Sequence, residues 1–196
     1  LRDVWHSRRK PVLVNSWEAF YFDYDHQRLL RFAREAAALG VELFVLDDGW
    51  FGHRDNDSTS LGDWWVHPKK LPEGLGALSR EINALGMEFG LWIEPEMVSE
   101  DSELYRAHPD WVLNPPGRPY TRGRCQLVLD YTRPEVRTYI FSSLQKVLDD
   151  AHVSFLKWDM NRALAQVWSA GLPADRQGEV YHRYVLGVYD LLERMR

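Results

Sequence analysis

Four short apolar runs alternate with helical patterns along the chain. The runs cover residues 11–16, 41–46, 87–93 and 153–158, and each is short enough to be a buried strand. Strands that alternate with helices predict a parallel sheet with right-handed crossovers. The pattern therefore predicts an α/β fold built from four strand–helix units in series.

Helix boundaries can be predicted from capping residues. Asp25 is suited to the N-cap of the first long helix, and Gly40 to its C-terminal stop. A second helix around Leu78 ends near Gly86, and a third begins with Pro134 at its first position. A fourth helix covers residues 180–195, while the long stretches after the second and third strands are predicted to be loops.

Two architectures contain such a series, a doubly wound sheet and a (β/α)8 barrel. No glycine-rich phosphate turn follows the first strand, which argues against dinucleotide binding. Polar and aromatic residues follow all four strands, and this favours the barrel, whose sites lie at that face. A full barrel needs roughly 250 residues. The predicted fold class is therefore a (β/α)8 TIM-barrel type, with residues 1–196 forming a partial catalytic domain of about half a barrel.

The residues after the strands are mainly carboxylates and indoles. Trp17 follows the first strand, Asp47 and Asp48 the second, Trp92 closes the third, and Asp159 follows the fourth. Because the carboxyl ends of parallel strands meet at one edge, these side chains should share one mouth. Acidic and aromatic groups in such a mouth are typical of carbohydrate binding.

Asp159 is the candidate nucleophile. A retaining glycosidase needs a carboxylate that attacks the anomeric carbon and a second acid that protonates the leaving oxygen. Lys157 lies two residues earlier, so both side chains point the same way from the strand. The lysine is expected to hold Asp159 ionised and to bond a sugar hydroxyl. The alternatives are a structural Lys–Asp pair and, more remotely, a Schiff-base lyase that uses Lys157.

The other polar candidates each have a simpler interpretation. Asp47 and Asp48 have oxygens that can accept hydrogen bonds from sugar hydroxyls, but they could also cap a turn or bind a divalent metal. Adjacent aspartates are common in loops, so no metal site is predicted. Trp92 could form a pocket wall or belong to the core, and Trp17 carries the same ambiguity. Arg124 could bind substrate or belong to a solvated basic loop.

Glu94 and Glu96 flank Pro95 immediately after the third strand. One of them could be catalytic, but salt bridges within the mouth are the favoured role. Cys125 has no histidine placed in sequence to activate it, so an inert thiol is expected.

Composition narrows the classes of function. A net charge of −5 without a long basic cluster argues against nucleic-acid binding, and no apolar run reaches membrane-spanning length. The single Cys125 excludes an internal disulfide framework and favours a reducing, cytoplasmic compartment. The chain starts at Leu1 without a secretory signal, although a signal lost upstream stays open. No cofactor is predicted.

Five segments together resemble the catalytic domain of the family 36 glycoside hydrolases, the large α-galactosidases of clan D. They occur in the family's order and cover nearly the whole chain. The segments are NSWEAFYFD (15–23), LDDGWFG (46–52), GLWIEPEM (90–97), QLVLD (126–130) and KWDMNR (157–162).

The resemblance implies a (β/α)8 barrel that hydrolyses α-galactosides with retention. It places the nucleophile at Asp159 and puts substrate binding on the residues that match the family's motifs. The implied binding residues are Trp17, Asp47, Asp48, Trp92, Arg124, Lys157 and Asn161. The family's general acid/base aspartate lies on a later strand, so the resemblance assigns no acid/base within this chain. A Cys- and Gly-rich loop at the sugar's 2-position is also absent.

The expected function is therefore a retaining α-galactosidase that acts on α-galactoside oligosaccharides of the melibiose or raffinose type. The full-length parent is expected to be a homo-oligomer. The alternatives are a galactosyl-transferring or α-N-acetylgalactosaminidase relative, and an inactive half-barrel fragment. The acceptor sites and the loop at the 2-position decide between the enzyme alternatives, and a downstream Asp-Asp segment supports the enzyme over the fragment.

Overall fold

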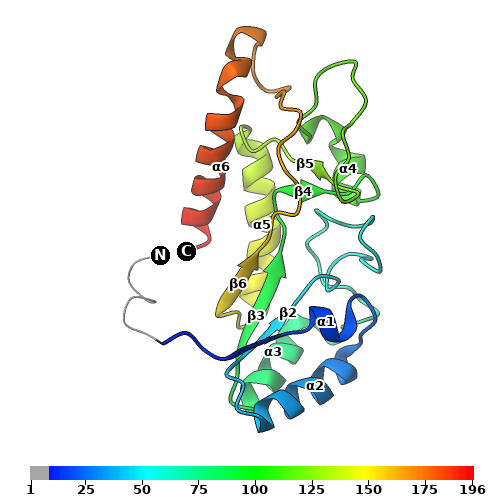
Figure 1. Ribbon diagram of the computed structural model, residues 1–196, viewed down its shortest axis with the longest axis vertical. Helices are drawn as coiled ribbons and strands as arrows, with labels where there is room; N and C mark the ends of the chain where they lie inside the picture. Colours follow the sequence, from blue (N-terminus) through cyan, green and yellow to red (C-terminus); the bar gives the residue numbers. More distant parts are fainter. Residues whose placement is uncertain (1–8) are drawn as a thin grey trace.

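The computed structural model describes residues 9–196, and a four-stranded parallel sheet forms its centre (Figure 1). The strands are adjacent in chain order, and all three ladders are parallel. They are β1 (Leu13–Asn15), β2 (Leu43–Leu46), β3 (Glu88–Ile93) and β6 (Phe155–Trp158). Four adjacent parallel strands confirm the α/β prediction. Closure into a (β/α)8 barrel stays a prediction, because β1 and β6 each pair on one side only within the described residues.

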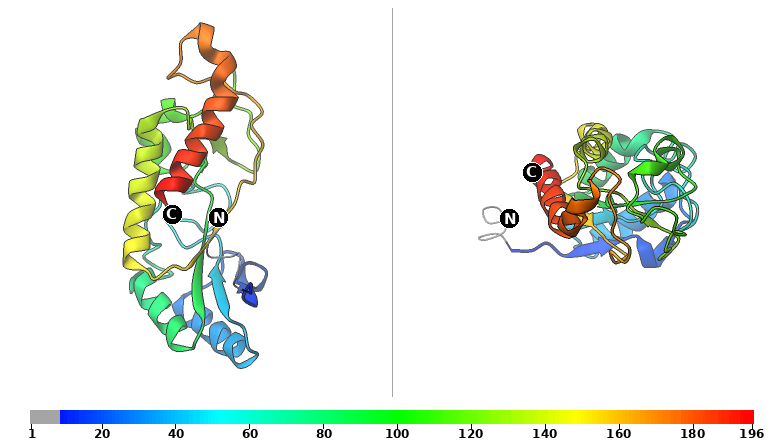
Figure 2. Two further views of the ribbon diagram at one scale, coloured as in Figure 1. Left: turned by 90° about the vertical axis from the view of Figure 1, so that its left-hand side faces the viewer. Right: turned by 90° about the horizontal axis from the view of Figure 1, so that it is seen from above.

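A long helix follows each strand, as predicted. The helices are α2 (His26–Ala38), α3 (Gly74–Ala84), α5 (Pro134–Asp150) and α6 (Val180–Arg194). Successive helices contact each other, α2 with α3, α3 with α5, and α5 with α6. Figure 2 shows α5 and α6 side by side along the molecule. No helix within residues 9–196 combines the length and the apolar character needed to cross a membrane.

The predicted capping residues adopt their expected roles. The Asp25 side chain accepts a hydrogen bond from the backbone N–H of Arg28 at 2.8 Å, and Pro134 occupies the start of α5. Gly40 and Gly86 have φ of +83° and +85°, the left-handed conformation that ends a helix. These turns lead directly into β2 and β3, so they fix where each strand begins.

The middle of the sheet is fully covered and its edges are not. Every residue of β2 is buried, and β3 is buried apart from its first residue, whereas β6 is half-buried throughout. A strand covered on both faces reads as a continuous apolar run, which is the pattern that identified residues 41–46. The core therefore lies between the central strands and the helices.

The connections between the long elements contain short elements that the hydrophobic pattern did not predict. They hold an antiparallel pair of two-residue strands and several short helical turns. The elements are α1 (Trp17–Phe20), β4 (Met97–Val98), α4 (Glu103–Ala107), η1 (Pro109–Trp111), β5 (Leu127–Val128) and η2 (Ala174–Glu179). Elements this short show no periodicity, and contacts distant in sequence hold them in place.

Candidate functional site

Asp47 and Lys157 meet at the carboxyl ends of β2 and β6. Lys157 Nζ lies 2.7 Å from Asp47 Oδ2, and Asn15 Nδ2 donates to the same oxygen at 2.6 Å. Three of the four strands, β1, β2 and β6, therefore contribute to one cluster, as the shared-mouth prediction required. The expected Lys157–Asp159 pair is wrong, because the lysine forms its ion pair with Asp47. The reason is that alternation along β6 does not reveal the buried Asp47 carboxylate after β2, which lies within reach of the lysine.

Three neutral donors orient the half-buried Asp159 carboxylate. Trp92 Nε1 and Asn161 Nδ2 donate to Oδ2 at 3.1 and 2.7 Å, and the Met160 backbone N–H donates to Oδ1 at 3.0 Å. The Asp159 backbone N–H also donates to the Ile93 carbonyl at 2.8 Å, which continues the β3–β6 ladder by one residue. The carboxylate is thus held in one direction by groups that leave its negative charge uncancelled.

Asp48 is held differently from Asp47. Both of its oxygens accept from the guanidinium of Arg54, at 2.9 and 2.8 Å, and the Arg54 residue is only 1% exposed. Burial raises the pKa of Asp48, and Arg54 opposes that rise. Lys70 donates to the carbonyls of Gly49 and Arg54 at 3.1 and 2.7 Å, which fixes the loop that carries the arginine.

Arg124 and Cys125 form the centre of a two-residue turn. Their φ angles are +53° and +57°, and the Gln126 N–H donates to the Gly123 carbonyl at 3.0 Å. Two left-handed central residues define the turn that usually selects Asn-Gly, so non-glycine residues here carry strain. The turn places Arg124 Nη1 3.4 Å from Asn161 Oδ1, which brings the predicted binding arginine to the Asp159 segment.

The two candidate tryptophans differ in burial. Trp92 is 2% exposed and stacks on Phe51 with 6.1 Å between ring centroids, so it belongs to the core while its N–H reaches Asp159. Trp17 is half-buried in α1, and its backbone N–H donates to Asn15 Oδ1 at 2.8 Å. Asn15 therefore links Trp17 to Asp47, a role that no sequence pattern indicated.

Glu94 and Glu96 were expected to form salt bridges. Within residues 9–196 neither of them does, so that prediction is wrong. Both residues are buried and accept hydrogen bonds from neutral donors. Glu94 accepts from the Asn161 N–H and from Gln126 Nε2, the latter at 2.9 Å. Glu96 accepts from Trp158 Nε1 at 3.0 Å and from the Tyr184 hydroxyl. Burial raises the pKa of Glu94 above its usual range.

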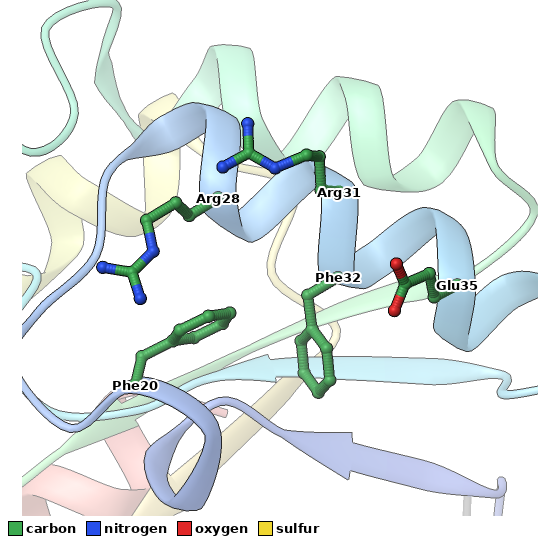
Figure 3. Close-up of a pocket in the computed structure, with 5 residues that line it drawn as sticks. All are labelled: Phe20, Arg28, Arg31, Phe32 and Glu35. Atoms are coloured by element: carbon green, nitrogen blue, oxygen red, sulfur yellow. The ribbon is translucent and has the colours of Figure 1, made fainter.

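A cavity of about 240 Å³ lies elsewhere, between α1 and α2 (Figure 3). Its lining residues are Phe20, Arg28, Arg31, Phe32 and Glu35. The Arg28 guanidinium lies over the Phe20 ring, 5.2 Å from its centroid, which closes part of the space. None of these residues belongs to the cluster around Asp47 and Asp159.

The cluster at the strand ends can bind a polyhydroxylated ligand and present a carboxylate to it. Asp47, Lys157 and Asn161 provide hydroxyl acceptors and donors around Asp159. Within residues 9–196, no group of three or more His, Cys, Asp or Glu side chains is arranged to hold a metal ion.

Known proteins match this chain over its whole length. AgaA, an α-galactosidase of Geobacillus stearothermophilus, is 52% identical over 194 residues, which are 99% of this chain and 27% of AgaA. The crystal structure of the GH36 α-galactosidase AgaB from the same organism has 53% identity and a TM-score of 0.97, covering 99% of this chain and 27% of AgaB. A crystal structure of an AgaA variant in complex with raffinose has 52% identity and a TM-score of 0.96, covering 98% and 27%.

The chain thus spans about a quarter of the length of the relatives it matches. The family model described as Melibiase matches residues 1–196, which is the entire sequence. The chain therefore belongs to the Melibiase family.

Proposed function

We propose that the full-length protein is a retaining α-galactosidase that removes terminal α-D-galactosyl residues from oligosaccharides of the melibiose or raffinose type. Family membership supports this proposal, as do close relatives that are α-galactosidases and the raffinose complex of one of them. The first half of a (β/α)8 barrel is the domain to which we assign residues 1–196. We place the protein in the cytoplasm as a homo-oligomer.

The orientation of Asp159 is the observation that carries the proposal. Its carboxylate is half-buried and held by Trp92, Asn161 and the Met160 N–H, all of them neutral. A nucleophile needs a fixed direction together with an uncancelled charge, and neutral donors supply both. In this proposal an Asp159 oxygen attacks the anomeric carbon, the aglycone oxygen leaves with a proton, and water later hydrolyses the glycosyl-enzyme ester.

The surrounding side chains bind the sugar hydroxyls. Asp47 accepts from hydroxyls with the lone pairs that Asn15 and Lys157 leave free, and the Lys157 ammonium donates. Arg124 and Asn161, which contact each other, bind further hydroxyls next to the nucleophile. Asp48 supplies a second acceptor whose direction is set by Arg54.

The two tryptophans shape the pocket in this proposal. Trp92 is buried behind Asp159 and forms a wall that also donates to the nucleophile. Trp17 is half-buried in α1 and provides an apolar face for the sugar ring. The general acid/base is assigned to a later strand of the full-length protein, since the family resemblance assigns none within residues 1–196.

Replacement of Asp159 tests the proposal directly. In the full-length protein, Asp159→Ala should abolish hydrolysis of nitrophenyl α-galactoside while leaving the thermal unfolding midpoint near that of the parent. Added azide should restore part of the turnover and give a glycosyl azide of inverted configuration, because a small anion fits where the carboxylate was removed.

The matched control is Asp149→Ala, which removes an exposed aspartate of α5 that takes no part in the cluster. It should turn over like the parent. Near-normal hydrolysis by the Asp159→Ala protein would remove Asp159 from the role of nucleophile.

A further inference from the structure

Glu94 is a buried carboxylate that no ion pair accounts for. The residue is 0% exposed and lies one position beyond the end of β3. None of the ion pairs among the described residues includes it, and both of its oxygens accept from neutral N–H groups. A buried carboxylate without a cationic partner costs stability, so an apolar residue would serve the core better.

One Glu94 oxygen is connected to the nucleophile through a single residue. The Asn161 backbone N–H donates to Glu94 Oε1, and the Asn161 side chain donates to Asp159 Oδ2 at 2.7 Å. Because Glu94 fixes the backbone of Asn161, it also fixes the direction from which the amide reaches Asp159. Loss of the Glu94 acceptor would let residues 159–161 move, and the Asp159 carboxylate would lose its fixed direction.

The other Glu94 oxygen reaches the turn that carries Arg124. Gln126 Nε2 donates to Oε2 at 2.9 Å, and Gln126 is the residue that closes this turn. Since an ionised carboxylate only accepts, the amide must present its nitrogen to Glu94. The buried Gln126 Oε1 then has no partner in the described part of the chain. An orphaned buried oxygen is a further cost of this contact.

The charged groups that face this network are few. Asp159 faces Glu94 from the end of β6. Burial raises the pKa of Glu94, and the negative charge of Asp159 raises it further. Arg162 donates to the Gln126 carbonyl at 2.7 Å, and Arg124 contacts Asn161. Within residues 9–196, neither guanidinium forms a hydrogen bond with the Glu94 carboxylate.

We propose that Glu94 is a positioning residue for the nucleophile, holding Asp159 through Asn161 and aligning the Arg124 turn through Gln126. This inference rests on the proposed glycosidase function for its kinetic consequence, but the geometry also has a consequence independent of turnover. The Asn161 N–H has Glu94 as its acceptor. Removing that acceptor must therefore loosen the Asn161 amide, whatever the activity of the protein.

Three variants of the full-length protein separate position from charge. Glu94→Met removes both acceptor oxygens at similar volume, and kcat should fall about 10²-fold with a much smaller change in KM, because the nucleophile is misplaced. Glu94→Gln keeps one acceptor for the Asn161 N–H, so kcat should stay within about tenfold of the parent. The control is Glu96→Gln, which neutralises a buried neighbour whose partners are Trp158 and Tyr184.

The split between kcat and KM is the readout that a merely structural role would not move. Misplacement of Asp159 lowers kcat for each folded molecule in Glu94→Met, whereas Glu94→Gln, which keeps an acceptor for Asn161, recovers most of it. The kcat of Glu96→Gln should stay near that of the parent. A parent-like kcat in Glu94→Met, or equal losses in Glu94→Met and Glu96→Gln, would overturn the inference.

A hydrogen-exchange experiment decides the inference even if the proposed function fails. The Asn161 N–H donates to Glu94, so deuterium exchange in peptides that cover residues 159–161 reports the loss of this acceptor. Exchange there should be faster in Glu94→Met and unchanged in Glu96→Gln. Unchanged exchange in Glu94→Met contradicts the role of Glu94, whereas an inactive parent protein contradicts only the α-galactosidase proposal.

Discussion

Asp48 and Arg54 form a buried ion pair at the mouth. Arg54 binds both of its oxygens and also lies over the Phe51 ring, 5.7 Å from the centroid. Breaking a buried pair by removing one partner typically costs about 3–5 kcal/mol, because it leaves an unpaired buried charge. At this scale, the arginine matters for both stability and the direction of Asp48.

We predict that Arg54→Met in the full-length protein lowers the thermal unfolding midpoint and reduces kcat/KM for nitrophenyl α-galactoside about tenfold or more. The unfolding midpoint and kcat/KM of Arg54→Lys should lie between those of Arg54→Met and the parent, since lysine keeps the charge but cannot bind both carboxylate oxygens. A double variant, Asp48→Asn with Arg54→Met, should recover part of the lost stability. Additive losses in the double variant would show that the pair is not coupled.

The stability loss in Arg54→Met should also depend on pH. Burial raises the pKa of Asp48 in the folded protein above its ordinary value of 3.8, and loss of the arginine raises it further. A raised folded pKa contributes stability below the unfolded value, and this contribution is lost as pH rises through the folded value. The gap in unfolding midpoint between Arg54→Met and the parent should therefore be smaller at pH 4.5 than at pH 7.5.

Residues next to strand ends were predictable from the sequence, and their partners were not. Asp47 and Asp159 are marked by their position after an apolar run, and Trp92 by its position at the end of one. Arg54 and Asn15 had no such mark, because a charged loop residue and a strand asparagine look the same whether or not they contact the site. The Lys157 pairing was wrong for a related reason, since alternation along one strand says nothing about side chains that arrive from other strands of the sheet.

Long elements followed from the pattern, and short ones did not. The apolar stripe of α5 spans a helix of 17 residues, long enough for periodicity to be read. The two-residue strands β4 and β5 pair through Met97–Val128 and Val98–Leu127, a contact between segments distant in sequence that no local pattern encodes. This small sheet positions the Arg124 turn, so the least predictable element supports part of the predicted site.

Helix α6 approaches the residues after β5 unusually closely, and Gly187 permits this. A Cβ at Gly187 would lie 2.1 Å from the Tyr131 carbonyl oxygen, a backbone atom that no side-chain rotation can move. Tyr131 in turn donates to the Pro95 carbonyl at 2.7 Å, next to Glu94 and Glu96. The packing of α6 is thus connected to the end of β3.

We predict that Gly187→Ala destabilises the full-length protein by about 1–3 kcal/mol through overpacking, despite the better helix propensity of alanine. The matched control is Gly178→Ala in η2, where an added Cβ meets nothing within 4 Å, and it should change stability by less than about 0.5 kcal/mol. Chemical denaturation of the three proteins gives the comparison. Equal stability of both variants would mean that α6 does not pack as closely as the structure shows.

At the scale of the whole molecule, the described residues leave apolar surface uncovered. Within residues 9–196, β1 and β6 each have one unpaired edge. The outward side of α6 is also apolar, with large side chains that are 44–59% exposed. They are Tyr181, Val185, Leu186, Tyr189 and Leu192. Open edges and a contiguous apolar face are surfaces that other parts of a protein usually cover.

We predict that a polypeptide of residues 1–196 alone self-associates and has no appreciable α-galactosidase activity. General-acid catalysis contributes roughly 10²–10⁴-fold, and none of the carboxylates around Asp159 is free for that role: Asp47 and Asp48 are in ion pairs and Glu94 is fully buried. Size-exclusion chromatography with light scattering should show oligomers or aggregates, and Leu186→Glu with Tyr189→Lys should shift them toward monomer. A monomeric unmodified polypeptide with robust turnover on nitrophenyl α-galactoside would contradict both parts, and would place an acid within these residues.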